Sequence, residues 1–158
     1  MTFFDYPTGE STPPDERGDY LLPGASEADW ADLLCFATTH HVAAGETLIA
    51  PGSLGRSLYL VADGVLEVML PTPHGRWHRV GTVGTGSLLG ELAFLDGQVR
   101  SALVRATTPV TVSELTFEDF SDLATERPDL ALLVAMDLGR ILAGRVRRHE
   151  AADLAGMS

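Results

Sequence analysis

The sequence predicts a mainly β fold with flanking helices: a β-roll or jelly roll with an N-terminal helix, a short internal helix and two C-terminal helices. Short apolar runs recur between turn residues over residues 40–115, which is typical of a sandwich, jelly roll or small barrel. Apolar residues at helical spacing precede this region and return after it. The length of 158 residues fits one domain around one core.

An N-terminal helix is predicted over residues 26–37. Ser26 is a favoured N-cap, and Asp29 places a carboxylate in the first turn. The apolar residues that follow at helical spacing are Trp30, Leu33, Leu34 and Ala37. Cys35 lies in the same apolar run, so we expect it to be a small core residue. It is the only cysteine, which excludes an intrachain disulfide.

Six apolar runs predict strands of the roll, at 47–49, 57–61, 65–69, 77–83, 102–104 and 110–115. The pair Asp63-Gly64 separates two of these runs, and such a pair between strands favours a tight hairpin. Residues 87–89 are also strand-like. A short apolar stretch of about one and a half helical turns follows them over residues 90–95.

Two helices are predicted after residue 115. Thr116 can cap the first of them, with Asp119 at the capping-box position. Pro128 suits the first position of the second helix, whose apolar spacing continues to about His149. The end of this helix is basic, which suits the negative end of its dipole, and we interpret it as solvated. Its arginines are Arg140, Arg145, Arg147 and Arg148.

We expect three segments along the chain: a flexible leader (1–24), one domain (25–150) and a C-terminal tail (151–158). Prolines, glycines and acidic residues interrupt any periodicity in the leader. The aromatic residues of the leader are candidates for docking on a partner or on the domain itself. They are Phe3, Phe4 and Tyr6.

The net charge is −11, from 22 acidic and 11 basic residues, so the field of the molecule should repel nucleic acid and anionic membranes. No uncharged apolar run reaches the length of a membrane span. The N-terminus lacks the basic and apolar regions of a secretory signal. These features predict a cytoplasmic protein that binds neither DNA nor membrane.

The segment 86–106, GSLLGELAFLDGQVRSALVRA, carries the candidate chemistry. A glycine at the start of a short helix lets backbone N–H groups face an anion closely. Arg100 can offer a bidentate fork to a phosphate, and Ser101 a hydroxyl. Glu91 would repel phosphate, but it can accept a hydrogen bond from a sugar hydroxyl beside it. These residues suggest a ligand with a phosphate and a ribose hydroxyl in close reach.

The same segment resembles the phosphate-binding cassette of the cyclic nucleotide-binding domain family. The resemblance rests on Gly90-Glu91-Leu92-Ala93 and on Arg100-Ser101-Ala102, with Val104-Arg105-Ala106 after them. Val99 departs from the pattern, because many relatives have proline before the arginine. The similarity extends over about residues 26–149 and includes the strands before the cassette and the helices after it.

The resemblance implies specific roles. Arg100 would pair with the cyclic phosphate, and Glu91 would bind the ribose 2′-hydroxyl. Ser101 would contact the phosphate or the purine edge. The long C-terminal helix usually caps the base, and there Arg145 could stack on the purine or be an ordinary solvated arginine. The full set of expected ligand-binding residues is Gly90, Glu91, Leu92, Ala93, Arg100, Ser101, Ala102 and Arg145.

The implied function is a cyclic nucleotide sensor that is not an enzyme and uses no metal or cofactor. Its ligand would be cAMP or cGMP. The expected base contacts, Ser101 and Arg145, do not distinguish between the two. The chain has no room for the helix-turn-helix of catabolite-type regulators, so we expect a stand-alone sensor. It would signal to an unidentified effector protein through its C-terminal helix, which could also support a homodimer.

Two alternatives compete with the sensor. One is a degenerate domain of the same fold that serves as a protein-interaction scaffold without nucleotide. Retention of Glu91 and Arg100 argues against it. The other is a cupin-like metal enzyme, which is disfavoured because the histidines form no spaced ligand set. Without the family pattern, Arg100 would equally fit a surface arginine and Glu91 a helix-start acid.

Overall fold

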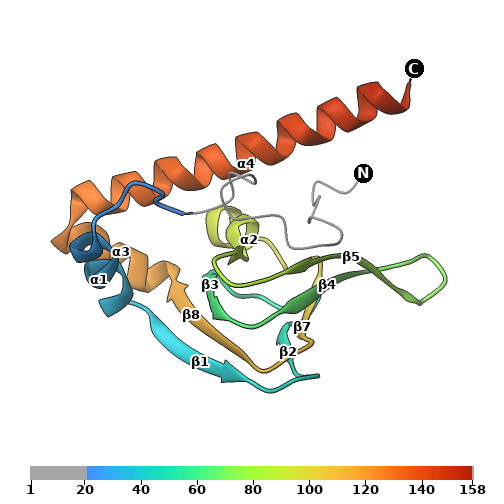
Figure 1. Ribbon diagram of the computed structural model, residues 1–158, viewed down its shortest axis with the longest axis horizontal. Coiled ribbons are helices and arrows are strands. Elements are labelled where there is room, and N and C mark those ends of the chain that lie inside the picture. Colours follow the sequence, from blue (N-terminus) through green and yellow to red (C-terminus); the bar gives the residue numbers. More distant parts are fainter. Residues whose placement is uncertain (1–20, 158) are drawn as a thin grey trace.

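The computed structural model describes residues 21–157, which form eight strands and four helices (Figure 1). The strands are β1 (Thr38–Val42), β2 (Thr47–Ile49), β3 (Ser57–Asp63), β4 (Leu66–Pro71), β5 (Trp77–Val83), β6 (Leu88–Leu89), β7 (Leu103–Ala106) and β8 (Val110–Thr116). The helices are α1 (Glu27–Cys35), α2 (Glu91–Asp96), α3 (Phe117–Glu126) and α4 (Pro128–Gly156). This arrangement confirms the predicted roll with flanking helices.

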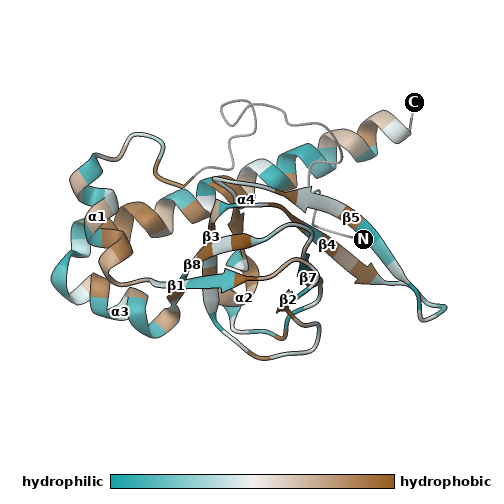
Figure 2. Ribbon diagram, turned by 60° about the horizontal axis from the view of Figure 1, so that its bottom comes forward, coloured by the Kyte–Doolittle hydropathy of each residue, from teal (hydrophilic) through white to brown (hydrophobic). Residues whose placement is uncertain are grey.

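The strands form two four-stranded antiparallel sheets with the orders β1-β8-β3-β6 and β2-β7-β4-β5. One core cluster lies between the two sheets and includes Leu66, Val68 and Val112. The other lies where the helices pack on the first sheet, and it includes Leu58, Leu115 and several α4 residues. In Figure 2, α4 is mainly apolar where it passes α1 and α3, and polar stretches follow further along.

The helix caps form as predicted from local sequence. The hydroxyl of Ser26 accepts a hydrogen bond from the Asp29 N–H at 3.1 Å. Thr116 and Asp119 form a complete capping box, with N–H to side-chain distances of 3.0 Å and 2.9 Å. Pro128 is the first residue of α4. Each cap satisfies backbone donors that a helix start leaves without a partner.

The hairpin predicted at Asp63-Gly64 is wrong, because β3 and β4 belong to different sheets. Gly64 has a φ of 102°, and a Cβ built on it would lie 2.4 Å from the Pro109 carbonyl oxygen. The glycine therefore allows the chain to cross from one sheet to the other. At this point the backbone packs closely against Pro109, the residue before β8. The hairpin of this region joins β4 to β5, where the Thr72 N–H donates to the Arg76 carbonyl at 2.7 Å.

Several element boundaries differ from the prediction. Cys35 is exposed rather than buried, because Leu33 is the residue that α1 turns into the core. Helix α4 continues past His149 to Gly156 and takes up most of the predicted tail. The six apolar runs did not include β1, because this strand is mostly polar and only its Val42 is buried.

The predicted leader is only partly described. Residues 1–20, with Phe3, Phe4 and Tyr6, lie outside the described residues. Leu21 and Leu22 are buried in the helical core cluster, and the Leu22 N–H donates to the carboxylate of Asp137 on α4. The packed unit therefore begins before residue 25. None of the helices within residues 21–157 is both long and apolar enough to cross a bilayer.

Candidate functional site

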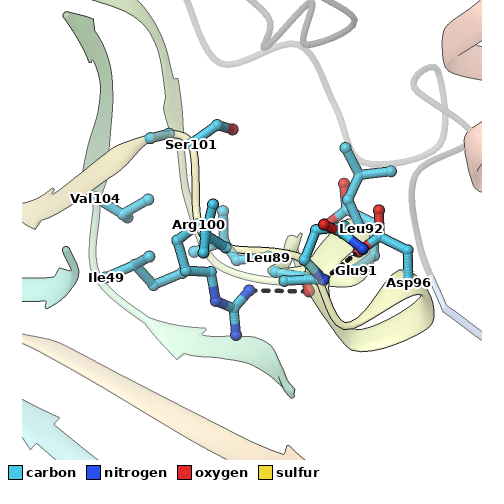
Figure 3. Close-up of a pocket in the computed structure, with 13 residues that line it drawn as sticks. Ile49, Leu89, Glu91, Leu92, Asp96, Arg100, Ser101 and Val104 are labelled. Carbon is cyan, nitrogen blue, oxygen red and sulfur yellow. Dashed lines mark hydrogen bonds between the residues drawn. The ribbon is translucent and has the colours of Figure 1, made fainter. Parts of the chain in front are cut away.

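A pocket opens beside α2 and the start of β7 (Figure 3). Seven of the eight expected ligand-binding residues line it: Gly90, Glu91, Leu92, Ala93, Arg100, Ser101 and Ala102. They gather there because one segment of chain supplies β6, α2 and the start of β7 in succession. Arg145 is not part of the pocket lining.

Gly90 begins the site because no other residue fits its position. Its φ is 80°, in the left-handed region, where it caps the start of α2. A Cβ on Gly90 would lie 2.6 Å from Nη1 of Arg100 and 2.6 Å from the Ser57 carbonyl oxygen. The missing side chain thus lets the arginine approach the cassette backbone.

Arg100 is only 7% exposed, so it is not an ordinary surface arginine. Its Nη1 donates to the Gly90 carbonyl at 3.0 Å, drawn in Figure 3, and its Nη2 donates to the Ser57 carbonyl at 2.8 Å. The backbone on both sides is also fixed, since the Arg100 N–H donates to Ser53 and the Arg100 carbonyl accepts from Gly52. The guanidinium is therefore held in one orientation at the wall of the pocket.

Tyr59 lies under this guanidinium, with its ring centroid 6.0 Å from Cζ of Arg100. Burial, together with the neighbouring Glu114 carboxylate, raises the pKa of Tyr59 to about 12. The phenol therefore stays protonated at neutral pH. Nothing in the local sequence singled Tyr59 out, because its place depends on the pairing of β3 with β6 and β8.

Glu91 is 1% exposed, so it is not an ordinary helix-start acid. Its Oε1 accepts a hydrogen bond from Nη1 of Arg145 in a buried ion pair. Its Oε2 is buried and has no hydrogen-bond partner within residues 21–157. Buried polar atoms without partners are rare in proteins and call for a specific explanation.

Arg145 is 7% exposed, which contradicts the interpretation of this helix end as solvated. It lies on the inward side of α4, seven residues after Leu138 and four after Ile141, which are both buried. In Figure 1, α4 passes over α2. The other arginines of this stretch, Arg140, Arg147 and Arg148, are exposed as expected.

The remaining lining residues form the rim and an apolar wall. Ser101 is exposed at the rim, and Figure 3 shows its hydroxyl directed away from the guanidinium of Arg100. Ile49 and Val104 face each other across β2 and β7 and line the apolar wall with Leu89. The sequence predicted these strands but not their pairing, so it did not place Ile49 in the site.

The described part of the chain holds no group of three His, Cys, Asp or Glu side chains that could bind a metal ion. The chemistry of the pocket is instead that of one arginine fork, one buried carboxylate and the backbone of α2. Such a set can bind and orient a polar ligand.

Comparison with known proteins gives the family. The model of the cyclic nucleotide-binding domain matches residues 39–127. The chain belongs to the cyclic nucleotide-binding domain family. It is 34% identical over 134 residues to the cyclic AMP receptor protein of Thermus thermophilus, covering 85% of this chain and 60% of the receptor. The solved catabolite activator protein of Thermus thermophilus superposes with a TM-score of 0.76 at 29% identity, covering 85% of this chain and 62% of that one.

A relative with a different name shows how widely this domain is used. Over 126 residues the chain is 35% identical to Glutaminase 2 of Bradyrhizobium diazoefficiens, covering 80% of this chain and 19% of the glutaminase. The chain thus spans less than two thirds of the length of each of these relatives.

Proposed function

We propose that this domain is a sensor that binds a cyclic nucleotide, cAMP or cGMP, without catalysis. The observation that carries the proposal is that Arg100 and Glu91, a cation and a carboxylate, line the same pocket. Arg100 presents a fixed cation, and Glu91 presents a buried carboxylate oxygen without a hydrogen-bond partner among residues 21–157. A cyclic nucleotide has a phosphate and a ribose hydroxyl within one small ring system, which suits this pair.

In the proposed complex, Arg100 pairs with the cyclic phosphate through a charge-assisted contact. The ribose 2′-hydroxyl donates to Oε2 of Glu91 and gives that atom the partner it lacks. The backbone of Gly90, Leu92 and Ala93 lines the phosphate side, and Ser101 and Ala102 form the rim. The net charge of −11 opposes anion binding at long range, so the local donors must outweigh it.

The buried pair of Glu91 with Arg145 supports a route from the ligand to α4. A ligand that contacts Glu91 changes the charge environment of Arg145 and thereby the position that α4 prefers. We propose that Arg145 either keeps this pair or turns to stack on the purine when the site is filled. The ligand can shift α4 only by the difference between its affinities for the two arrangements.

Isothermal titration tests the proposal directly. Wild type, Arg100→Ala and a control, Arg79→Ala on β5, are titrated with cAMP, cGMP and a cyclic dinucleotide. Loss of the buried charge partner should weaken binding by about 2–5 kcal/mol in Arg100→Ala, while Arg79→Ala should bind like wild type. The sensor proposal fails if wild type binds none of the three nucleotides at about 100 μM. A dissociation constant above that concentration corresponds to a binding free energy weaker than about −5.5 kcal/mol.

One observation favours a second candidate, a scaffold of the same fold that binds no nucleotide. Two Arg100 nitrogens already donate to backbone carbonyls, and Arg145 already pairs with one oxygen of Glu91. If these contacts are permanent, the protein itself already uses these groups of Arg100 and Glu91, and a nucleotide would have to compete for them. The same titration separates the two candidates, because the scaffold would stay folded and give no heat with any nucleotide.

The exposed apolar residues of α4 support a contact with an effector protein or with a second copy of the chain. These residues are Leu132, Leu133, Met136, Val146 and Leu154. Light scattering after size exclusion should show a dimer that Met136→Glu converts to a monomer, because Met136 is 68% exposed. A wild-type monomer with and without nucleotide would contradict the homodimer.

A further inference from the structure

Arg56, which immediately precedes β3, connects two helices that the chain separates. Its Nε donates to the Phe94 carbonyl at 3.0 Å, and its Nη2 donates to the Leu95 carbonyl at 3.0 Å. Both carbonyls belong to the last turn of α2, where a helix leaves its carbonyls without intrahelical partners. A cation is also favourable at this end of a helix.

The same guanidinium lies over the first residue of α3. Its Cζ is 3.6 Å from the centroid of the Phe117 ring, within the range of a cation–π contact. The backbone carbonyl of Arg56 also accepts a hydrogen bond from the Phe117 N–H at 2.8 Å. One residue thus holds the end of α2 and the start of α3 together by four contacts.

The apolar side of this junction is equally close. The Phe94 ring of α2 lies 5.6 Å from the rings of both Phe117 and Phe120 of α3. Phe94 is 1% exposed, so α2 has little room to move without moving these rings. Gly97 ends α2 with a φ of 69°, and a Cβ there would lie 3.4 Å from Cδ of Arg56, which shows how closely the arginine covers the turn.

We infer that Arg56 is a positioning residue that transmits displacement of the cassette helix α2 to α3 and, through it, to α4. This inference rests on the proposed function, in which nucleotide contacts the start of α2. Arginines from outside then hold α2 at both ends, Arg145 at Glu91 and Arg56 at the last carbonyls. Arg56 does not line the pocket, so its role is to pass on a change and not to bind the ligand.

Hydrogen exchange followed by mass spectrometry tests the link with three variants. Arg56→Gln removes the charge and the fork. Arg56→Lys keeps a cation over Phe117 but cannot donate to both carbonyls in the fixed fork geometry. Arg79→Gln is the matched control, because Arg79 is also exposed but lies on β5 of the other sheet.

Without ligand, Arg56→Gln should raise exchange at the end of α2 and in the first turn of α3 together, by about three- to tenfold, the factor for loss of one ordinary hydrogen bond. With cAMP or cGMP, it should still bind, because Arg100 and Glu91 are unchanged. The protection that nucleotide induces in α3 and α4 of wild type should fall by at least about half. Arg56→Lys should restore part of it.

The inference is overturned if nucleotide protects α3 of Arg56→Gln as it protects wild type. It is also overturned if Arg56→Gln loses binding itself, because Arg56 would then serve the pocket and not the link. If wild type binds no nucleotide, the proposed function fails. Exchange without ligand then still tests whether Arg56 couples α2 to α3. Unchanged α3 exchange in ligand-free Arg56→Gln would contradict the link, and a joint rise in α2 and α3 would support it.

Discussion

Two arginines of this domain hold carboxylates in opposite environments. Arg145 pairs with Glu91 beneath α4, where the two side chains are 8% and 1% exposed. Arg127, between α3 and α4, contacts Asp29 and Asp129 at 3.0 Å and also Asp32, with all four side chains at least 29% exposed. The chemical groups are the same, and the difference lies in how much water reaches them.

This difference in exposure decides how much each pair contributes to stability. Exposed ion pairs stabilise little, because water screens them and long side chains lose freedom. A buried pair loses the hydration of both ions, and its attraction offsets that loss only when every polar atom has a partner. Glu91 falls short of this condition at Oε2. The ligand contact proposed above would supply the partner that Oε2 lacks, whereas Arg127 ties α1 to the start of α4.

The largest expected effect is at the buried pair. Arg145→Met leaves the Glu91 carboxylate buried without its cation, so the free energy of unfolding should fall by about 3–5 kcal/mol. Adding Glu91→Gln should recover most of this loss, because no charge then stays unpaired. Urea unfolding of the two single variants and the double variant measures the coupling. A single variant within about 1 kcal/mol of wild type would mean that water reaches Glu91.

An intermediate effect is expected at Glu67 and Arg105, which pair across β4 and β7 at 2.5 Å. The Glu67 side chain is 14% exposed, between Glu91 and the aspartates that contact Arg127, while Arg105 is 42% exposed. Glu67→Gln should lower the free energy of unfolding by about 0.2–1 kcal/mol at low salt. The loss should shrink in about 1 M salt, where screening is strong. A loss as large as that at Arg145 would break the relation between exposure and effect.

The smallest effect is expected at Arg127, and it should depend on pH. The Arg127 guanidinium lowers the pKa of Asp29 and of Asp129 below the ordinary value of 3.8. A carboxyl with a lower pKa in the folded state stabilises the fold above its unfolded pKa, and this stability disappears as the pH falls through the folded pKa. Thermal melting of Arg127→Gln should therefore differ slightly from wild type at pH 7. The two curves should converge below about pH 3.8, and a difference that grows in acid would contradict the assignment.

Local signals in the sequence predicted local structure well. The capping box of Thr116 and Asp119 and the start of α4 at Pro128 involve residues at most three positions apart, so composition and spacing determine them. Seven of the expected residues line one pocket for the same reason, since one continuous segment carries them.

The errors concern contacts between distant parts of the chain. Asp63 and Gly64 are typical hairpin residues, but here the positive φ of Gly64 lets the chain cross from one sheet to the other. The crossing packs against Pro109, which is 45 positions away in the sequence. For Arg145 the sequence left open stacking on the purine or a solvated position and predicted no partner, because Glu91 lies 54 positions away. Arg56 has no local signal at all, since its two carbonyl partners lie 38 and 39 positions away.

The length of α4 has a mechanical consequence. The helix has 29 residues, which span about 44 Å at 1.5 Å per residue. A single residue, Arg127, separates it from α3, and residues 151–157 are all exposed. A tilt of about 10° around that joint would carry the far end of a rod of this length through about 8 Å. Glu91 contacts the helix at Arg145, about 26 Å from that joint, so a displacement there would be magnified about 1.7-fold at the outer tip.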